Sequence, residues 1–270
     1  MCQRLLTIAL WAAVSAWAPL ALAQQDDRPF LNNPETFGRP TDDNTLRVCI
    51  DLRDPLWEID REIAQALAAV LLLEPEIHLI DDGRTSVPLD DVYSYLRGQC
   101  RVYFGFRLVA GMYPSWASVT RAYYDARYVF VTDGTEYAAL ADIPAGRPVG
   151  VTLGSSADFR FTPYNNALSP NARWTRRPYG TDAQALAALE NGDVEAALVW
   201  GPALVGYQGG ADFSVIAPDP LQLETMPVGG LMLSGDVFLR QSLDEGIAAM
   251  LAGGEIERAI ADRPFLSLPE

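Results

Sequence analysis

The chain has 270 residues, of which 35 are acidic and 20 are basic, so its formal net charge is −15. This excess of acid argues against nucleic acid and anionic membranes as partners, because both are themselves negatively charged. The acidic surface serves either solubility alone or the attraction of a basic partner. The single histidine, His78, has no second imidazole with which to build a metal site.

The N-terminal segment has the pattern of a secretory signal peptide, residues 1–23. Arg4 precedes an apolar run that ends in an A-x-A motif, so we expect cleavage after Ala23 and a periplasmic protein. A membrane anchor is the alternative, because the run is nearly long enough to span a bilayer. No later stretch resembles a membrane span. Residues 24–45 are polar, contain three prolines and predict a flexible tail.

Two cysteines remain after export, because Cys2 leaves with the signal peptide. An even pair in an oxidising compartment predicts a disulfide between Cys49 and Cys100. Both lie on or beside strands that we expect to be sheet neighbours, so the geometry is feasible. Two unpaired buried thiols are the alternative.

From residue 46 onward, predicted strands and helices alternate. Strands are expected at residues 46–50, 77–80 and 102–106, with helices between them. On the first helix Ile59, Ile63, Leu67 and Val70 recur at helical spacing, and the second helix covers residues 89–96. This alternation predicts an α/β fold with right-handed crossovers, mostly parallel sheets and helices on both faces.

A second α/β unit begins after an extended segment at residues 128–132. It opens with a strand at residues 149–153. Thr181, with Gln184 three residues later, fits a capping box for a helix that ends at Gly192. The apolar run at residues 196–200 predicts a parallel strand covered on both faces. Another extended piece at residues 227–233 precedes helices at 237–251 and 256–260.

The two extended segments that bracket the middle unit predict two lobes joined by two hinge crossings. One lobe is discontinuous and consists of residues 46–132 plus 227–270. The other lobe is continuous and consists of residues 133–226.

Several segments, in their order and spacing, resemble type 2 periplasmic solute-binding proteins over nearly all of residues 46–265. They are "LRVCID", "IDREIAQALA", "YLRGQCRVYFG", "RAYYDARYVFVT", "GRPVGVTLGSSAD" and "NGDVEAAL". The resemblance implies a two-lobe fold of this type. In such α/β proteins the ligand lies in the crevice beyond the carboxyl ends of the strands.

Four loops are therefore expected to line a cleft, at residues 51–57, 106–116, 154–157 and 200–202. The candidate cleft residues are Asp51, Trp57, Arg107, Tyr113, Trp116, Gly154, Ser155, Ser156 and Trp200. The Gly-Ser-Ser corner either holds an anion or is a plain helix N-cap. The aromatic rings either line the cleft or pack in the core and between the lobes. The first of these loops is short, which leaves the cleft more open.

Two charged anchors implied by the resemblance are replaced in this chain. Members that bind amino acids carry an arginine near the position of Trp116 for the ligand carboxylate and an aspartate at Trp200 for its ammonium. Arg107 either compensates for the first loss or is a solvated rim arginine. The usual amino-acid chemistry is thus absent while the fold is kept.

The cysteine in "LRVC", the G-x-C before the third strand and "ALVWGPALVGY" are similar to one branch, the MoxJ (MxaJ) and XoxJ accessory proteins of quinoprotein methanol dehydrogenase systems. That branch usually has an aspartate at the position of Arg101. The resemblance implies a noncatalytic periplasmic accessory factor for assembly or activation of a PQQ-dependent methanol or alcohol dehydrogenase. Its partner would be the dehydrogenase, its cytochrome c, or both.

The alternative function is a substrate-binding receptor of an ABC importer for a small non-amino-acid solute. An enzyme on the same fold is a third hypothesis, which rests on analogy alone. A serine triad would need His78, which lies mid-strand and far in sequence from Ser155. The acid pairs at Asp81 and Asp90 are expected to be solvated charges, and no cofactor or metal site is expected.

Overall fold

The computed structural model describes residues 44–81, 87–109, 111, 113–134 and 136–269. The predicted signal peptide and nearly all of the predicted tail lie outside the described residues. Within the described ranges, no helix is both long enough and apolar enough to cross a membrane.

The first half of the chain alternates strands with helices, as predicted. Its elements are β1 (Thr45–Asp51), α2 (Trp57–Val70), β2 (Glu74–Ile80), α3 (Leu89–Gly98), β3 (Val102–Arg107), β4 (Ala117–Val119) and β5 (Tyr124–Asp133). Strand β2 begins three residues before its predicted start, and β5 begins four residues before, because neither start is marked by an apolar alternation.

The second half continues in the same manner and ends in two helices and a short strand. Its elements are β6 (Pro148–Thr152), α4 (Ser156–Ala167), β7 (Thr175–Tyr179), α5 (Asp182–Glu190), β8 (Ala196–Trp200), α6 (Ala203–Gly206), β9 (Phe213–Ile216), β10 (Thr225–Leu233), α7 (Val237–Gly253), α8 (Glu255–Ile260) and β11 (Leu266–Ser267). Two short 3-10 turns lie at Leu140–Asp142 and Pro170–Ala172.

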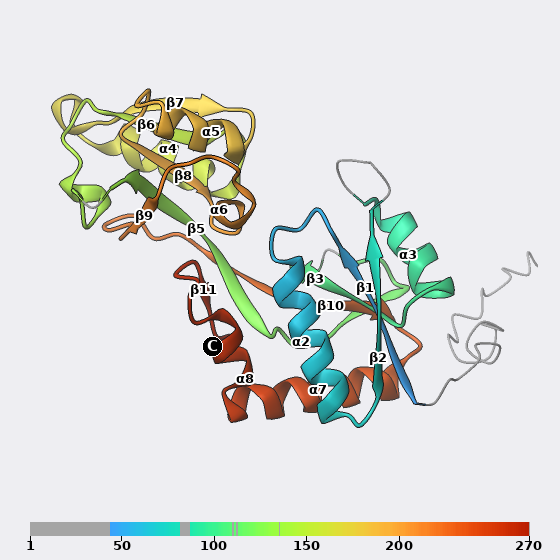
Figure 1. Cartoon of the computed structure of the whole chain (residues 1–270). Coiled ribbons are helices and arrows are strands. Elements are labelled where there is room, and N and C mark those ends of the chain that lie inside the picture. The colour runs from blue at the N-terminus through green and yellow to red at the C-terminus, as the bar shows by residue number, and fades with distance from the viewer. Residues whose placement is uncertain (1–43, 82–86, 110, 112, 135, 270) are drawn as a thin grey trace, which may run out of the picture. The chain divides into compact units, whose positions relative to one another are not determined.

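The strands of the first sheet follow the order β2-β1-β3-β10-β5. Strand β1 pairs in parallel with both β2 and β3, while β10 is antiparallel to β3, β4 and β5. Helices α2 and α7 contact each other, and α2 also covers β1, β2 and β3 (Figure 1). In the second sheet, β6 pairs in parallel with β7 and β8.

Strand β5 belongs to both sheets. Its first part, up to Arg127, pairs with β10, whereas Tyr128 to Val131 pair with β8. Strand β9 pairs with β5 from Phe130 to Asp133, and the chain returns through residues 217–224 into β10. Because only β5 and this return segment carry the backbone between the sheets, the fold has two lobes joined by two crossings.

Buried apolar side chains lie against both sheets, and one cluster includes residues of both. On α2, Ile59, Ile63 and Leu67 are buried against the first sheet, as the helical spacing predicts. Val70 does not follow this prediction and remains 45% exposed, because it is the last residue of the helix and turns toward solvent. In the second lobe, Phe130, Phe161 and Trp174 form an aromatic cluster against β6 and β8.

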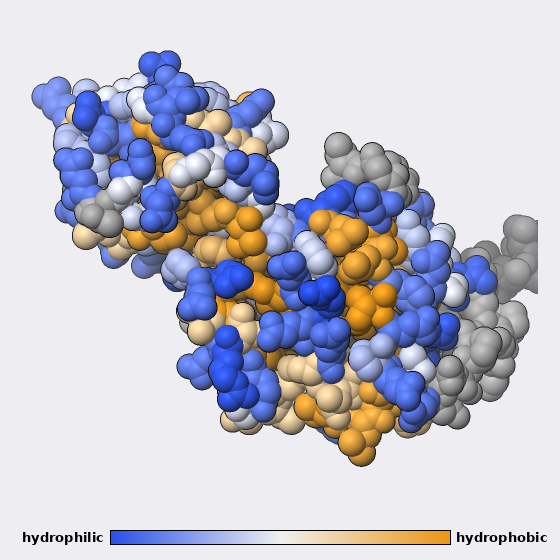
Figure 2. Space-filling view, viewed as in Figure 1, coloured by the Kyte–Doolittle hydropathy of each residue, from blue (hydrophilic) through white to orange (hydrophobic). Residues whose placement is uncertain are grey.

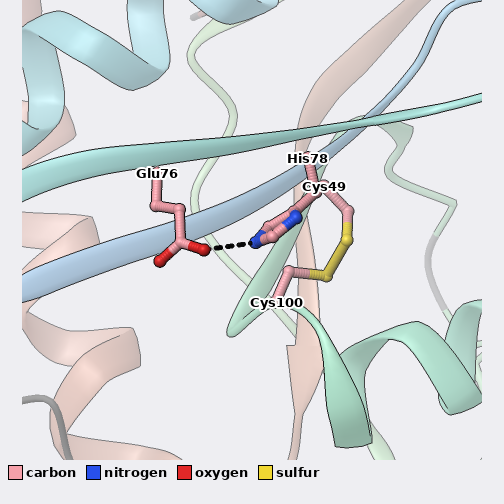
Figure 3. Close-up of a disulfide and its surroundings, with 4 residues drawn as sticks. All are labelled: Cys49, Glu76, His78 and Cys100. Carbon is pink, nitrogen blue, oxygen red and sulfur yellow. Dashed lines mark ion pairs between the residues drawn. A yellow bond between two sulfur atoms is a disulfide. The ribbon is translucent and has the colours of Figure 1, made fainter.

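The predicted disulfide is present (Figure 3). Cys49 on β1 and Cys100, two residues before β3, are bonded with a Cα to Cα distance of 5.6 Å, and both are buried. His78 lies beside them on β2 with its Nε2 3.0 Å from Glu76 Oε1. Since β1 and β3 are adjacent strands, the bond fixes the spacing of two strands that both end at the cavity described below.

The face shown in Figure 2 has hydrophilic residues over much of its area, together with apolar patches. One patch lies at the turn that joins α2 to β2, where Leu72 is 85% exposed. Other exposed apolar side chains include Phe159 on α4 and Phe238 on α7. Scattered exposed apolar residues of this kind are usual on soluble domains.

Candidate functional site

A cavity of about 480 Å³ lies at the carboxyl ends of β1 and β3. Its lining residues are Asp51, Arg53, Asp54, Pro55, Val87, Val92, Tyr103, Phe104, Gly105, Phe106, Arg107 and Trp200. All but one of these belong to the first lobe. Trp200, the last residue of β8, is contributed by the second lobe, so residues from three of the four predicted cleft loops line the cavity.

Two charged residues of the cavity lining, Arg53 and Asp51, form an ion pair where the chain leaves β1. The Arg53 guanidinium donates to both oxygens of Asp51, with Nε to Oδ1 at 2.6 Å and Nη2 to Oδ2 at 3.0 Å. This bidentate geometry matches the fork of a guanidinium to a carboxylate. Asp51 also accepts the Arg53 backbone N–H at 3.0 Å, so its charge is largely satisfied within the loop.

The second arginine of the lining reaches across to the second lobe. The Arg107 Cζ atom lies 5.0 Å from the centre of the Trp200 ring, a cation–π distance. Tyr128, at the point where β5 enters the second lobe, packs edge-on against the same ring with centroids 5.0 Å apart. The cavity is therefore bridged by side chains of the protein itself.

A buried acidic group lies under the cavity floor. Asp60, in the first turn of α2, is fully buried, and its Oδ1 accepts the hydroxyls of Tyr123 and Tyr124, each at 2.9 Å. Its Oδ2 has no hydrogen-bond partner among the described residues. Gly105 covers this atom: a Cβ placed on Gly105 would lie 2.7 Å from Asp60 Oδ2 and 3.5 Å from Asp54 Oδ2.

Burial controls the protonation of these two carboxyls. Desolvation, reinforced by the charge of Asp54, raises the pKa of Asp60 to about 8, despite the two tyrosine donors. Desolvation also raises the pKa of Asp54. Two weaker effects lower it: the hydrogen bond that Asp54 Oδ1 accepts from the Leu56 N–H at 2.9 Å, and the positive charge of Arg107. Burial and the neighbouring Asp60 charge raise the pKa of both Tyr123 and Tyr124, so these hydroxyls remain donors.

Of the predicted cleft residues, Asp51, Arg107 and Trp200 line this one cavity. Trp57 instead packs against a buried apolar cluster that includes residues of both lobes, with the Arg61 Cζ atom 5.0 Å from its ring centre. Trp116 packs against Tyr93, with ring centroids 4.9 Å apart.

The predicted segment between β3 and β4 therefore contributes mainly to packing. The Tyr113 hydroxyl accepts the Val109 N–H, and its ring lies 6.1 Å from that of Phe106. Met112 of this segment lies outside the described residues.

The Gly-Ser-Ser corner after β6 is occupied by the chain's own carboxylate. Ser155 is the N-cap of α4 and accepts the Asp158 N–H at 3.1 Å, while the Gly154 N–H donates to Asp158 Oδ2 at 3.2 Å. The Arg176 guanidinium donates to both oxygens of Asp158, at 2.7 and 2.6 Å. Ser156 bonds the Tyr128 hydroxyl. Neither Gly154, Ser155 nor Ser156 lines the cavity of about 480 Å³.

Several lining or floor residues had no distinguishing sequence signal. Asp54 lies in a predicted cleft loop, but Tyr103 and Gly105 lie inside a predicted strand, where no motif marks them. Asp60 directly follows Ile59, which belongs to the apolar stripe of α2. An acidic residue beside such a stripe is the one sequence feature that could have marked Asp60 as a buried polar group.

A metal site requires several ligating side chains arranged around one ion. Among the described residues, no cluster of three or more histidine, cysteine, aspartate or glutamate side chains is arranged to hold a metal ion. Arg101 pairs its Nε with Asp236 Oδ2 at 3.3 Å.

Solved structures share this fold across most of the chain. The second substrate-binding domain of GlnP from Lactococcus lactis, in its open conformation, superposes with a TM-score of 0.62 at 16% identity, covering 82% of this chain and 95% of that domain. A polar amino acid ABC uptake transporter substrate-binding protein from Streptococcus thermophilus gives 0.57 at 19% identity, covering 83% and 87%. The VFT2 domain of BvgS from Bordetella pertussis gives 0.54 at 20% identity, covering 83% and 94%.

No protein-family model and no curated protein matches this sequence. At 16 to 20% identity, the structural likeness shows the fold alone. That fold is the α/β, two-lobe type 2 solute-binding fold that the order of the sequence motifs predicts.

Proposed function

We propose that this chain is a noncatalytic, exported accessory protein on a solute-binding fold, whose task is to bind another protein. We infer that the partner is a periplasmic PQQ-dependent methanol or alcohol dehydrogenase, its cytochrome c, or both, and that the chain assists assembly or activation. The choice of partner rests on the sequence resemblance to MoxJ (MxaJ) and XoxJ accessory proteins.

The observation that carries the proposal is the contact between Arg107 and Trp200. In a solute receptor, the ligand bridges the two lobes and its binding free energy closes them. Here a first-lobe guanidinium lies 5.0 Å from the centre of a second-lobe ring and makes such a bridge from within the chain. The lobes therefore have an internal connection that does not require a solute.

Two further positions in the chain support a function that does not require a bound solute. The Gly154 N–H and the N-cap Ser155, which could hold a ligand anion, are both engaged by Asp158. Asp51, which could hold a ligand cation, is engaged by Arg53. Side chains of the chain thus satisfy polar groups that a receptor would leave for its solute.

The charge of the chain fits a protein partner with a basic surface. A net charge of −15 favours association with a basic patch through long-range attraction, which increases the rate of encounter. Such attraction is screened by salt.

The direct test is binding of the mature chain to purified, PQQ-loaded dehydrogenase with and without its cytochrome c, at low and at high salt. We expect association at low salt that weakens at high salt, together with increased activity or assembly of the dehydrogenase. An exported acidic protein of similar size serves as control. Absence of association at both salt concentrations, with dehydrogenase and cytochrome both tested, would refute the proposal.

A second candidate, a receptor for a small non-amino-acid solute, is favoured by the cavity itself. Its volume of about 480 Å³ suits a small molecule, and Asp54, Arg107 and Trp200 offer a carboxyl, a guanidinium and a ring. A ligand at a hundredfold excess over its Kd stabilises the folded state by about 2.7 kcal/mol.

Thermal unfolding with panels of amines, alcohols, sugars, carboxylates and quinones tests this candidate. A solute that raises the midpoint for the wild type but not for Trp200→Ala would establish a receptor. Phe238→Ala is a matched control, because that exposed ring lies outside the cavity. A flat response across the panel would eliminate the receptor function for those classes.

A further inference from the structure

The buried carboxyl of Asp60 is the most unusual polar group in the described part of the chain. It is fully buried in the first turn of α2, and one of its oxygens has two donors while the other has no partner among the described residues. A buried carboxylate oxygen without a partner is strongly unfavourable, because the charge has lost its hydration. Such a group is stabilised by taking up a proton.

A second carboxyl faces the same glycine. Asp60 Oδ2 and Asp54 Oδ2 both point at the position that a Gly105 side chain would occupy, and Gly105 has a positive φ of 76°. The two carboxyls thus approach each other around one residue. Arg107 is the charge that acts favourably on Asp54, and Asp51 is the charge that opposes it. Two carboxyls in this arrangement cannot both ionise at low cost.

We propose that Asp54 and Asp60 together hold one exchangeable proton beneath the cavity floor, and that loss of this proton loosens the loop formed by residues 51–56. This inference is independent of which partner or solute the chain binds. It concerns the floor of the cavity and the loop that forms one of its walls.

Asp60 and Asp54 differ in how far each can respond to that loss. Asp60 is fixed by Tyr123 and Tyr124, and its backbone N–H is bonded to Leu56 O at 3.0 Å. The backbone of Asp54 is also bonded, since its N–H donates to Asp51 O at 3.1 Å, but its carboxyl lies on a turn, where Oδ1 accepts the Leu56 N–H. When both carboxyls are charged, repulsion therefore displaces Asp54, and the loop that carries it moves with it.

The direction of the Asp60 pKa shift determines how the stability of the folded state changes with pH. The pKa of Asp60 in the folded chain, about 8, is above its ordinary value of 3.8, so the folded state binds the proton more tightly than the unfolded state. The stabilisation is complete below the ordinary pKa and is lost as the pH rises through the folded value. Because of this pair, the folded state is therefore expected to lose stability progressively as the pH rises from the ordinary value of 3.8 to about 8, and to lose no more above it.

The proton can be observed directly by carbon-13 NMR of the mature chain labelled at the aspartate side-chain carboxyls. We expect one resonance to titrate with a midpoint near 8. Asp60→Asn should remove that resonance and, in urea unfolding, should abolish the loss of stability with rising pH. Asparagine suits the site because its oxygen accepts the tyrosine hydroxyls and its amide replaces the protonated oxygen.

Two further variants separate proton binding from a purely structural role. Asp54→Asn removes the charge that raises the pKa of Asp60, so the midpoint should fall. Tyr124→Phe removes a donor that lowers the pKa of Asp60, so the midpoint should rise. Glu58→Gln, on the exposed side of the same helix, should leave the midpoint unchanged.

The proposal is overturned if no wild-type aspartate titrates above about pH 6, well beyond the ordinary range of this residue. It is also overturned if Asp54→Asn leaves the midpoint where it was. If Asp60→Asn fails to fold, the Asp54→Asn and Tyr124→Phe shifts still decide the outcome.

Discussion

Gly105, on β3, lies directly beside the buried carboxyl of Asp60 on α2. Its φ of 76° lies in the left-handed region, and a Cβ there would be 2.7 Å from Asp60 Oδ2. Both conditions favour glycine, because other residues adopt this conformation at a cost and because the space is already filled. Its N–H also donates to the Tyr123 hydroxyl at 2.8 Å, so the residue supports the donor that faces Asp60.

Gly105→Ala should therefore destabilise the fold more than an alanine at a comparable open position. Gly111 is the matched control, since it has the same φ of 76° and nothing within 4 Å of the place that an added methyl group would take. We expect Gly105→Ala to lose roughly 1 to 3 kcal/mol more unfolding free energy than Gly111→Ala, the usual cost of overpacking. Urea unfolding at one pH measures both, and equal losses would contradict the close contact with Asp60.

The residues around Asp60 also show why part of the site escaped prediction. The apolar spacing of α2 identified Ile59, Ile63 and Leu67, but the same pattern gives no reason to bury Asp60. Its partners Tyr123 and Tyr124 lie more than sixty residues away in sequence. Such a contact depends on how β5 crosses the first sheet, which local periodicity does not specify.

Among the elements, the strands with continuous apolar sequence were predicted well. β8 is buried on both faces, and its run of apolar residues marks it clearly. β7, with sequence TRRPY, is polar and pairs only with β6 at the edge of its sheet, so neither alternation nor apolarity marks it. The helix start at Thr181 was predicted from the capping box, and its Oγ1 accepts the Gln184 N–H at 3.2 Å.

The disulfide links β1 to the segment just before β3 in the first lobe. It joins positions 51 residues apart and encloses α2, β2 and α3. In the chain-entropy model a loop of this length contributes about 4 kcal/mol by restricting the unfolded state. Replacing both Cys49 and Cys100 with serine should lower the unfolding free energy by a few kcal/mol.

The matched control is the wild-type chain unfolded under reducing conditions. It should approach the stability of the double variant, because both lack the covalent restriction. If reduction leaves the urea midpoint unchanged, the bond does not form in solution or does not restrain the unfolded chain.

The whole molecule carries a large excess of negative charge. A net charge of −15 produces repulsion within the folded chain, because the acidic groups are held closer together than after unfolding. The exposed ion pairs, such as Arg258 with Glu255, offset little of this repulsion.

Added salt should therefore stabilise this protein. Raising ionic strength from about 10 mM to about 150 mM shortens the screening length from roughly 30 Å to roughly 8 Å, which weakens the repulsion. The thermal unfolding midpoint should rise, and choline chloride should act like sodium chloride because the effect depends on ionic strength. A midpoint that stays constant or falls would mean that local ion pairs outweigh the net charge.

Residues 264–267 lie against the strand that leads from one lobe to the other. Leu266 pairs with Ala126 on β5, the Arg127 guanidinium donates to Pro264 O, and Phe265 packs directly on Gly201 after β8. Any rotation of the lobes must therefore change the surroundings of this short segment. A fluorescent or spin reporter attached at Ser267 would follow that rotation in real time, with or without a bound partner.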